Sequence, residues 1–434
     1  MEGVILGFAV VIVLIVVGMP VAMAFGALTF VLIIWFDADP SYLIPTTFIK
    51  IRSVVLLAVP LFILFGHLLD SSGLAKRLVD FVNSLIGHLK GGLGTVTVVT
   101  TAVFSAISGT DSAAIACIGT VMIPRLEEHG YPRGHATALV ACSGILGQLV
   151  PPSVPMIFYA IITGNSIPAV WLATLGPAVL IVIIYSALST WAVRKLPIKV
   201  TRKAESFGQY RRTVARATIK ALPVLILPVI VLGGIYGGIV TPTEGACLGA
   251  AYVLVVGAFF YRSIRMGEIR DAMVSAAVIS GVVMIMIFFT EVSSKILVIE
   301  GVTEELSNWI LDISPNIYTT LLLLNFVLLL MGMMMNDLSG TVLAAALLYP
   351  IAINAGVHPL HFAAIVGVNL GLGTVTPPTA PMLFLAGRIG NCNARDYIRP
   401  AMFFMWGGML PVLAVTTYWP EVSLFLPRLA GFIR

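Results

Sequence analysis

Four short segments place hydroxyl, amide and carboxylate side chains next to glycine inside long apolar runs. They are SGTD at 108–111, GQLVPPS at 147–153, NDLS at 336–339 and GTVTPPT at 373–379. Carboxylates, hydroxyls and carbonyls are the oxygen ligands that hard cations prefer, whereas a transition-metal site usually includes cysteine or histidine. The residue types in these segments therefore favour a small hard cation, and sodium is the natural candidate.

Two of the segments contain adjacent prolines, Pro151–Pro152 and Pro377–Pro378, within what otherwise reads as a membrane helix. Proline removes a helical hydrogen bond and clashes with the preceding turn. A helix broken within a membrane exposes N–H groups from one half and carbonyls from the other, at dipole ends of opposite sign. Inverted-repeat transporters bind substrates and coupling ions at such breaks. A single proline kink is often only structural, but the matched pairs favour a binding role.

The composition places these segments in an integral membrane protein. Hydrophobic residues make up 59% of the 434 residues, charged residues only 10%, and the mean hydropathy is +1.03, whereas about a quarter of the residues in soluble domains are charged. The four cysteines have no disulfide or metal-ligand spacing. Ten apolar segments approach the roughly 20 residues that cross a bilayer: 3–18, 20–36, 51–70, 134–163, 169–193, 219–238, 243–261, 272–294, 359–388 and 400–419.

Positive charge is distributed unevenly between the predicted loops. If 194–220 is cytoplasmic, all but five of the 25 Lys and Arg residues lie on the cytoplasmic side. That asymmetry follows the positive-inside rule and accounts for the net charge of +5 without a nucleic-acid partner. With 194–220 in the cytoplasm and ten spans crossing the membrane, both termini are expected to lie outside the cytoplasm.

The two halves of the chain are related in sequence. Shifting the chain by about 226 positions aligns 111–165 with 337–391 without a gap, with sixteen of 55 positions identical, including Asp111 with Asp337 and both proline pairs. Each half has five spans, an odd number, so the second copy enters the membrane from the opposite side. The sequence thus predicts an all-α polytopic membrane protein built from two inverted repeats, each with a re-entrant hairpin and a proline-broken helix.

The two repeats divide into corresponding parts. The first repeat, 1–195, is expected to contain scaffold spans in 1–70, an arm helix at 74–90, a hairpin at 91–124, a broken helix at 132–163 and a span at 169–193. A basic cytoplasmic linker follows at 196–218. The second repeat, 219–420, is expected to contain scaffold spans in 219–294, an arm helix at 301–313, a hairpin at 316–353, a broken helix at 359–388 and a span at 400–419, before a tail at 421–434.

Each repeat is expected to form one sodium site, where its hairpin tip meets its own helix break. The first site would comprise Ser108, Gly109, Thr110, Asp111, Gly147, Val150 and Pro151. The second would comprise Gly332, Asn336, Asp337, Ser339, Gly373, Thr376 and Pro377. Ser153 and Thr379 follow the two breaks, where they are expected to contact an anionic substrate. Asp111 and Asp337 have an alternative role as simple helix caps.

An enzyme is a weaker interpretation of the same residues. An intramembrane aspartyl protease would need two close carboxylates that share a proton, and Asp111 and Asp337 are expected to stay apart on tips that enter from opposite faces. No nucleophile constellation or organic cofactor motif accompanies them. A channel is also possible, but paired hairpins indicate occlusion more than an open pore.

Several long motifs resemble the large membrane subunit of tripartite ATP-independent periplasmic (TRAP) transporters. They include SGTDSAAIACIGTVMIP, GILGQLVPPSVPMIFYAIITGNSI, GGIVTPTEGA, NDLSGTVLAAALLYPI and GTVTPPTAPMLF, and the similarity extends from the opening GMPVAMAFG through essentially the whole chain. The resemblance implies a secondary transporter in the bacterial inner membrane that works by an elevator mechanism. Its substrates would be C4-dicarboxylates, sialic acid or other sugar acids.

The resemblance also implies partners and coupling ions. A periplasmic binding protein would deliver the acid, a small four-helix membrane subunit would sit beside this chain, and about two or more sodium ions would accompany the substrate. Family members usually have small or apolar residues at Asp111 and Gln148, and often leucine at Asn336, so the first site departs from the family pattern. Arg388 either contacts a carboxylate or marks a cytoplasmic helix end. The rival transporter is a stand-alone sodium- or proton-coupled symporter of the divalent-anion class, which needs no binding protein.

Overall fold

The computed structural model describes residues 2–72, 74–87, 91–198, 207–261, 263–302, 305 and 316–433, and these residues form helices and turns without a strand. The arm helix expected at 301–313 falls almost entirely outside them. The helices of the first half are α1 (Glu2–Val16), α2 (Val21–Phe36), α3 (Pro40–Ile51), η1 (Val54–Leu57), α4 (Ala58–Ser71), α5 (Ala75–Ile86), α6 (Gly92–Ser108), α7 (Asp111–Glu128), α8 (Arg133–Gly144), α9 (Leu146–Leu149), α10 (Val154–Thr163) and α11 (Ile167–Val193).

The first helix after the gap at 199–206, α12, begins at Phe207, within the segment 196–218 that was predicted as the linker. The helices of the second half are α12 (Phe207–Tyr236), α13 (Pro242–Val255), η2 (Val256–Phe260), α14 (Met266–Ile299), α16 (Ile317–Met334), α17 (Asp337–Leu343), η3 (Ala344–Leu348), α18 (Tyr349–Asn354), α19 (Pro359–Val375), α20 (Pro381–Ile389), α21 (Ala394–Phe404), η4 (Met405–Met409), α22 (Leu410–Tyr418) and α23 (Glu421–Leu429).

Eight helices of the described residues are long and apolar enough to cross a membrane, or nine if the bent pair Pro40–Ile49 and Val54–Leu69 is one span. The sequence predicted ten. Two changes account for the difference. Helices α1, α2 and α19 have only 15 to 17 residues, fewer than the roughly 20 that span a bilayer alone, whereas the two arms of the expected hairpin, Ile317–Met334 and Asp337–Asn354, are each long and apolar enough to count. The protein is a multi-pass membrane protein by both counts.

The segments expected as the linker, 196–218, and the tail, 421–434, each contain helix. Helix α12 starts at Phe207, inside the expected linker, and Tyr210 of its first turns donates a hydrogen bond to the Leu85 carbonyl at 3.3 Å. The segment expected as a tail contains α23, which packs on α11. In both cases a tertiary partner compensates for a helix that is short or highly charged on its own.

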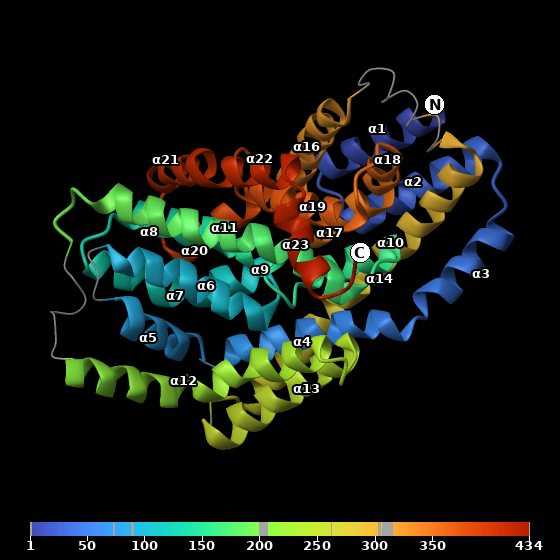
Figure 1. The fold of residues 1–434 in the computed structure, drawn as a ribbon. Helices are drawn as coiled ribbons and strands as arrows, with labels where there is room; N and C mark the ends of the chain where they lie inside the picture. Colours follow the sequence, from blue (N-terminus) through green and yellow to red (C-terminus); the bar gives the residue numbers. More distant parts are fainter. Residues whose placement is uncertain are drawn as a thin grey trace.

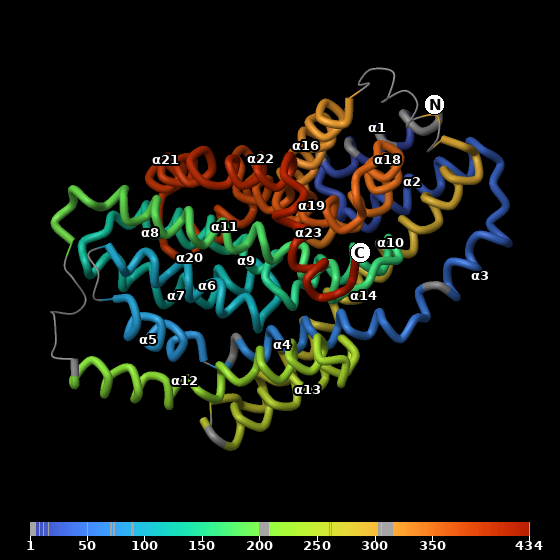
Figure 2. The backbone as a smooth tube through the Cα atoms, viewed as in Figure 1, coloured from blue at the N-terminus to red at the C-terminus, as the bar shows by residue number. Residues whose placement is uncertain are grey.

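The helices form a central bundle with a layer beside it (Figure 1). Helices α6 to α11 and α19 to α22 pack together in the bundle, whereas α4, α12 and α13 contact one another along its lower side in this view. Helix α14 packs against α2, α3 and α4. The tube in Figure 2 traces the chain through the short helices α9 and α10, which belong to the bundle and contact α11.

Polar contacts hold α14 to its neighbours at the edge of the molecule. The hydroxyls of Thr29 and Ser293 lie 3.0 Å apart between α2 and α14. The ammonium group of Lys295 donates hydrogen bonds to the hydroxyls of Thr46 at 2.9 Å and Thr47 at 3.1 Å. These contacts satisfy polar groups that would otherwise be costly among apolar residues.

Candidate functional site

The first hairpin tip is a two-residue turn between α6 and α7 that packs on the first helix break. Gly109 ends α6 with a φ of 70°, a left-handed conformation that favours glycine. Its carbonyl accepts a hydrogen bond from the N–H of Val154 at 3.0 Å. A β-carbon on Gly147 would lie 2.5 Å from the nitrogen of Asp111. The structure therefore places the tip residues 109–111 directly against both sides of the break.

The break leaves some backbone carbonyls of the first half without donors. The hydroxyl of Ser153 donates to the Gln148 carbonyl at 2.6 Å, and that of Thr174 donates to the Leu149 carbonyl at 2.7 Å. The indole N–H of Trp171 donates to the Ser153 carbonyl at 3.0 Å. Within the described part of the chain, no hydrogen bond is recorded to the carbonyls of Val150 or Pro151. These two oxygens are therefore free to bind a cation beside the tip.

The second tip packs on the second break in a corresponding way. A β-carbon on Gly332 would lie 3.0 Å from the α-carbon of Gly373, so the backbones of α16 and α19 touch. The Asn336 carboxamide accepts a hydrogen bond from the N–H of Ser339 at 2.8 Å and caps α17. Because Asn336 supplies this cap, the carboxylate of Asp337 is not needed for it.

The two breaks differ in their exposure. Val150, Pro151, Pro152 and Ser153 are all buried, whereas Thr376 and Pro377 are half-buried, and Pro378 and Thr379 are exposed. The hydroxyl of Thr379 donates a hydrogen bond to the Met333 carbonyl next to the second tip. In this conformation the second tip-and-break pair is therefore the more accessible one.

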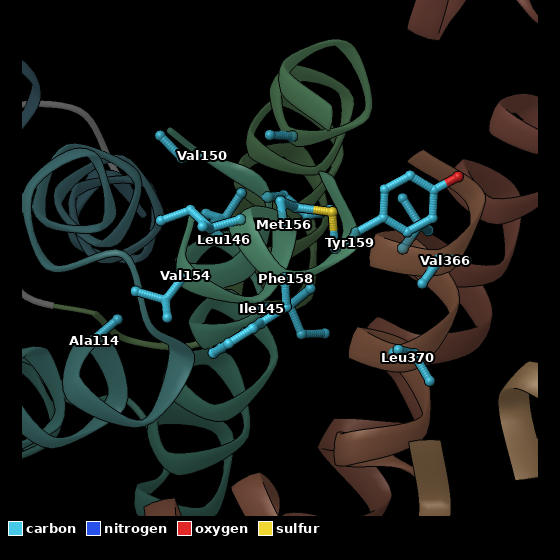
Figure 3. Close-up of a cluster of buried hydrophobic side chains, with 14 of the residues drawn as sticks. Ala114, Ile145, Leu146, Val150, Val154, Met156, Phe158, Tyr159, Val366 and Leu370 are labelled. Carbon is cyan, nitrogen blue, oxygen red and sulfur yellow. The ribbon is translucent and has the colours of Figure 1, made fainter. Parts of the chain in front are cut away.

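Helices from the two halves interlock between the breaks. Figure 3 shows Met156 and Tyr159 of α10 facing Val366 and Leu370 of α19. Helix α10 also packs on α17, and α20 packs on α7, so each broken helix contacts the hairpin of the other half. All four apolar side chains are buried, and this apolar contact brings both tip-and-break pairs into one region.

The expectation that Asp111 and Asp337 stay apart is wrong. Their side chains lie within hydrogen-bonding reach of one another, and their residues are only 1% and 6% exposed. Oδ1 of Asp111 accepts a hydrogen bond from the N–H of Ser112 at 2.6 Å, whereas Oδ2 accepts none from any N–H or O–H donor of the described residues. The two aspartates come close because each broken helix packs against the hairpin of the other half. The expectation that they stay apart treated each hairpin by itself and left this packing out.

The three residues predicted to contact substrate lie in different surroundings. The Ser153 hydroxyl is fully buried, and besides its bond to Gln148 it accepts a hydrogen bond from the N–H of Met156 at 3.4 Å as the N-cap of α10. Thr379 is exposed at the second break. Arg388 is exposed near the end of α20 and lines a hollow of about 640 Å³ with Asn391, Asn393 and Tyr397.

Some buried polar residues near the breaks were not predicted as site residues. The Gln148 amide donates to the Gly367 carbonyl at 3.0 Å and so ties the first break to α19. The Asn369 amide donates to the side-chain oxygen of Asn325 at 2.6 Å, and the Asn325 amide donates to Thr417 at 3.1 Å. Amides inside apolar helices were the available signal, since polar groups at membrane depth are rarely incidental.

The ligand set fits sodium better than a transition metal. Among the residues that the structure describes, no group of three or more His, Cys, Asp or Glu side chains is placed to hold a metal. At the first tip, the buried side-chain atoms without a hydrogen-bond partner among the described residues are oxygens, namely Oδ2 of Asp111 and the hydroxyl of Ser108. Oxygen ligands without sulfur or imidazole suit alkali and alkaline-earth cations.

Comparison with known proteins gives one consistent family. Residues 8–422 match the model of the tripartite ATP-independent periplasmic transporter, DctM component. The isethionate TRAP transporter permease protein DctMQ of Oleidesulfovibrio alaskensis is 34% identical over 94% of this chain, which spans 64% of that relative's length. The C4-dicarboxylate large permease protein DctM of Pseudomonas aeruginosa is 33% identical over 87% of both chains. The sialic acid large permease protein SiaM of Vibrio cholerae is 32% identical over 95% of both chains.

A solved structure has a similar fold. The Alcanivorax borkumensis YdaH transporter superposes with a TM-score of 0.59, covering 88% of this chain and 90% of that one, at 15% sequence identity. At that identity the likeness concerns the fold alone.

Proposed function

The chain belongs to the DctM family, the large permease component of tripartite ATP-independent periplasmic transporters, and from this premise we propose that it is a sodium-coupled symporter that imports an organic acid. A periplasmic binding protein delivers the acid, and a small membrane subunit completes the complex in the bacterial inner membrane. Both termini face the periplasm in this proposal. The observation that carries it is the contact of each hairpin tip with the helix break of its own half. At the first break, the carbonyls of Val150 and Pro151 and Oδ2 of Asp111 accept no hydrogen bond from a described residue.

The substrate class follows from the relatives and from the accessible groups near the second break. The relatives are named for isethionate, C4-dicarboxylates, sialic acid and 2,3-diketo-L-gulonate, all of which carry a negative charge at neutral pH. The hydroxyl of Thr379 would suit an acid oxygen once it is released from the Met333 carbonyl, and the guanidinium group of Arg388 suits a carboxylate at the mouth of its hollow. Ser153 would join this set only in a conformation that releases its hydroxyl from α10.

In this proposal, sodium binding and substrate binding are coupled because sodium fixes the two hairpin tips in one conformation. A sodium ion at the Val150 and Pro151 carbonyls would fix the first tip against its break, and one beside Gly373 and Thr376 would do the same for the second tip. An ordered tip presents its helix N-terminus to the acid, where the dipole favours an anion. Binding of either ligand then strengthens binding of the other.

An elevator motion is the transport step that this arrangement suits. Hairpins and broken helices would move together as one body, because each broken helix packs on the hairpin of the other half. Helices α2, α13 and α14 would form the scaffold against which that body slides. Two or more sodium ions with a singly charged acid would carry net positive charge inward, worth about 2.3 kcal/mol per charge at 100 mV.

Thermal unfolding of the detergent-purified protein across a sodium titration, with choline at matched ionic strength, tests the sodium sites. A ligand that binds only the folded state stabilises it by about 2.7 kcal/mol at a hundredfold excess over its Kd. We expect a sodium-specific rise in Tm that is reduced in Asp337→Ala and retained in Asp271→Ala, which changes an exposed carboxylate on α14.

The absence of a sodium-specific shift, both for this chain alone and for its complex with the small subunit, would contradict sodium coupling.

Uptake by reconstituted vesicles distinguishes the TRAP transporter from the stand-alone anion symporter. We expect acid uptake only when the small subunit and the binding protein are both present. Uptake by this chain alone would instead favour the stand-alone anion symporter.

A further inference from the structure

The contact between Asp111 and Asp337 presents a charge problem that the two tip-and-break sites do not solve. The two side chains are almost completely buried and lie within hydrogen-bonding reach of one another. Oδ1 of Asp111 already accepts a hydrogen bond from the backbone N–H of Ser112 at 2.6 Å. Among the residues that the structure describes, no lysine, arginine or histidine forms an ion pair with either one.

Two adjacent buried carboxylates cannot both carry a charge without a positive partner between them. A shared proton needs only the two carboxyl oxygens, whereas a metal cation needs a shell of several oxygens. Further oxygens without partners are present on the same two hairpins. The hydroxyl of Ser108 lies at the first tip, and that of Thr341 lies one helical turn after Asp337 on the same face of α17. Both are buried and have no hydrogen-bond partner in the described part of the chain.

We propose that Asp111 and Asp337 jointly bind a single sodium ion between the two hairpin tips, rather than each serving a separate ion in its own half. This inference rests on the proposed sodium coupling and deepens it. Oδ2 of Asp111, which has no other partner, would be one ligand, and the hydroxyls of Ser108 and Thr341 would complete the shell. The backbone carbonyls at the two breaks would then bind their own ions without a carboxylate. The shared ion would join the two hairpins, so that both tips close only when it is bound.

Counting bound sodium ions distinguishes a shared ion from separate ions. Equilibrium binding of ²²Na⁺ to the purified transporter complex would be measured for wild type, Asp111→Asn, Asp337→Asn, the double variant and Asp271→Asn. Asparagine keeps the shape of the side chain and removes its charge. If the carboxylates share one ion, each single variant and the double variant should all bind one fewer ion than wild type, and Asp271→Asn should match wild type.

Each other outcome has a defined meaning. A double variant that binds two fewer ions than wild type would show that the aspartates serve separate ions and would overturn the proposal. Unchanged stoichiometry in all variants would also overturn it and would leave a shared proton to neutralise the pair, while sodium coupling itself would stand. No sodium binding by wild type would instead contradict the proposed function.

A second measurement keeps the test decisive if a variant unfolds. Ser108→Ala and Thr341→Ala remove hydroxyls and leave both carboxylates in place. We expect the sodium titration of each to become less steep, because the affinity of the shared ion falls while the ions at the breaks are retained. If both variants titrate as steeply as wild type, the hydroxyls of Ser108 and Thr341 are not ligands of the shared sodium ion, and the proposed set of ligands is wrong. Thr319→Ala, on the outer part of α16, is the matched hydroxyl control.

Discussion

Ser153 and Thr379 occupy equivalent positions after the two proline pairs, yet the structure gives them different environments. Ser153 is completely buried, bonds to the Gln148 carbonyl and caps α10. Thr379 is exposed and bonds to a carbonyl beside the second tip. A hydroxyl that caps a buried helix contributes mainly to stability, whereas the exposed hydroxyl of Thr379 can exchange its bond to the Met333 carbonyl for one to a ligand.

Alanine substitution should separate these two roles. We expect Ser153→Ala to lower the free energy of unfolding by about 1 to 2 kcal/mol and to leave the KM for acid uptake unchanged. Thr379→Ala should raise KM with a smaller effect on Tm. Thermal unfolding and uptake by the reconstituted complex measure both quantities. An increase in KM for Ser153→Ala at unchanged stability would show that its hydroxyl reaches the substrate after all.

The proline pairs act through the helices that they interrupt. By ending α9 and α19, they free the carbonyls that follow and allow the hairpin tips to approach the breaks closely. Glycine is required at these contacts, because Gly147 lies against the backbone of Thr110 and Asp111, and Gly373 lies against Gly332. Each contact between tip and break is therefore backbone on backbone, where no side chain can rearrange to make room.

Gly147→Ala should push the first tip away from its break. The added methyl group would meet the backbone of Thr110 and Asp111, and overpacking of this kind costs about 1 to 3 kcal/mol. We expect Gly147→Ala to lower the Tm measured without sodium, and to reduce the further rise in Tm on adding sodium by a larger fraction. Gly281→Ala is the matched control, because nothing lies within 4 Å of the added atom on α14 and alanine favours a helix by up to about 1 kcal/mol over glycine. A Gly147→Ala protein with unchanged sodium affinity would show that the contact is not part of the ion site.

At the scale of the whole molecule, the proposed elevator motion would move the tips relative to the scaffold helices. Helix α4 touches the first tip, since a β-carbon on Gly66 would lie 3.0 Å from the carbonyl oxygen and 3.9 Å from the α-carbon of Ser108. In an elevator motion this contact breaks once in every cycle. The contact between α2 and α14, by contrast, lies within the expected scaffold and persists.

Cross-linking tests this motion in a protein whose four native cysteines have been replaced. Oxidation of Gly66→Cys/Ser108→Cys should abolish the uptake that the same variant shows when reduced, because a β-carbon on Gly66 lies close enough to Ser108 for a disulfide. The reduced variant is the reference for this comparison, since the loss of the Ser108 hydroxyl is itself expected to weaken sodium binding. The control pair Thr29→Cys/Ser293→Cys should cross-link without loss of uptake. Full uptake by the oxidised Gly66→Cys/Ser108→Cys protein would argue that the tip does not leave α4 during transport.

The sequence alone determined the class of the protein and the identity of its chemical segments. Hydropathy, the matched proline pairs and the family motifs depend on local residue types, and the membrane class and the TRAP family prediction are confirmed. The inverted repeats, the hairpins and the sodium sites stay predictions. Helix lengths were predicted less well, because α12 and α23 depend on tertiary partners.

Only the tertiary structure decided which segments meet across the two halves. Nothing in the spacing of Asp111 and Asp337 indicates that their carboxylates touch, because the contact results from the packing of α10 on α17 and of α20 on α7. The same packing buries the first break and leaves the second accessible, although their sequences are nearly equivalent. Residue patterns are local, whereas contacts between residues far apart in the chain depend on how all the helices pack together, and that packing sets the chemistry of the buried pair.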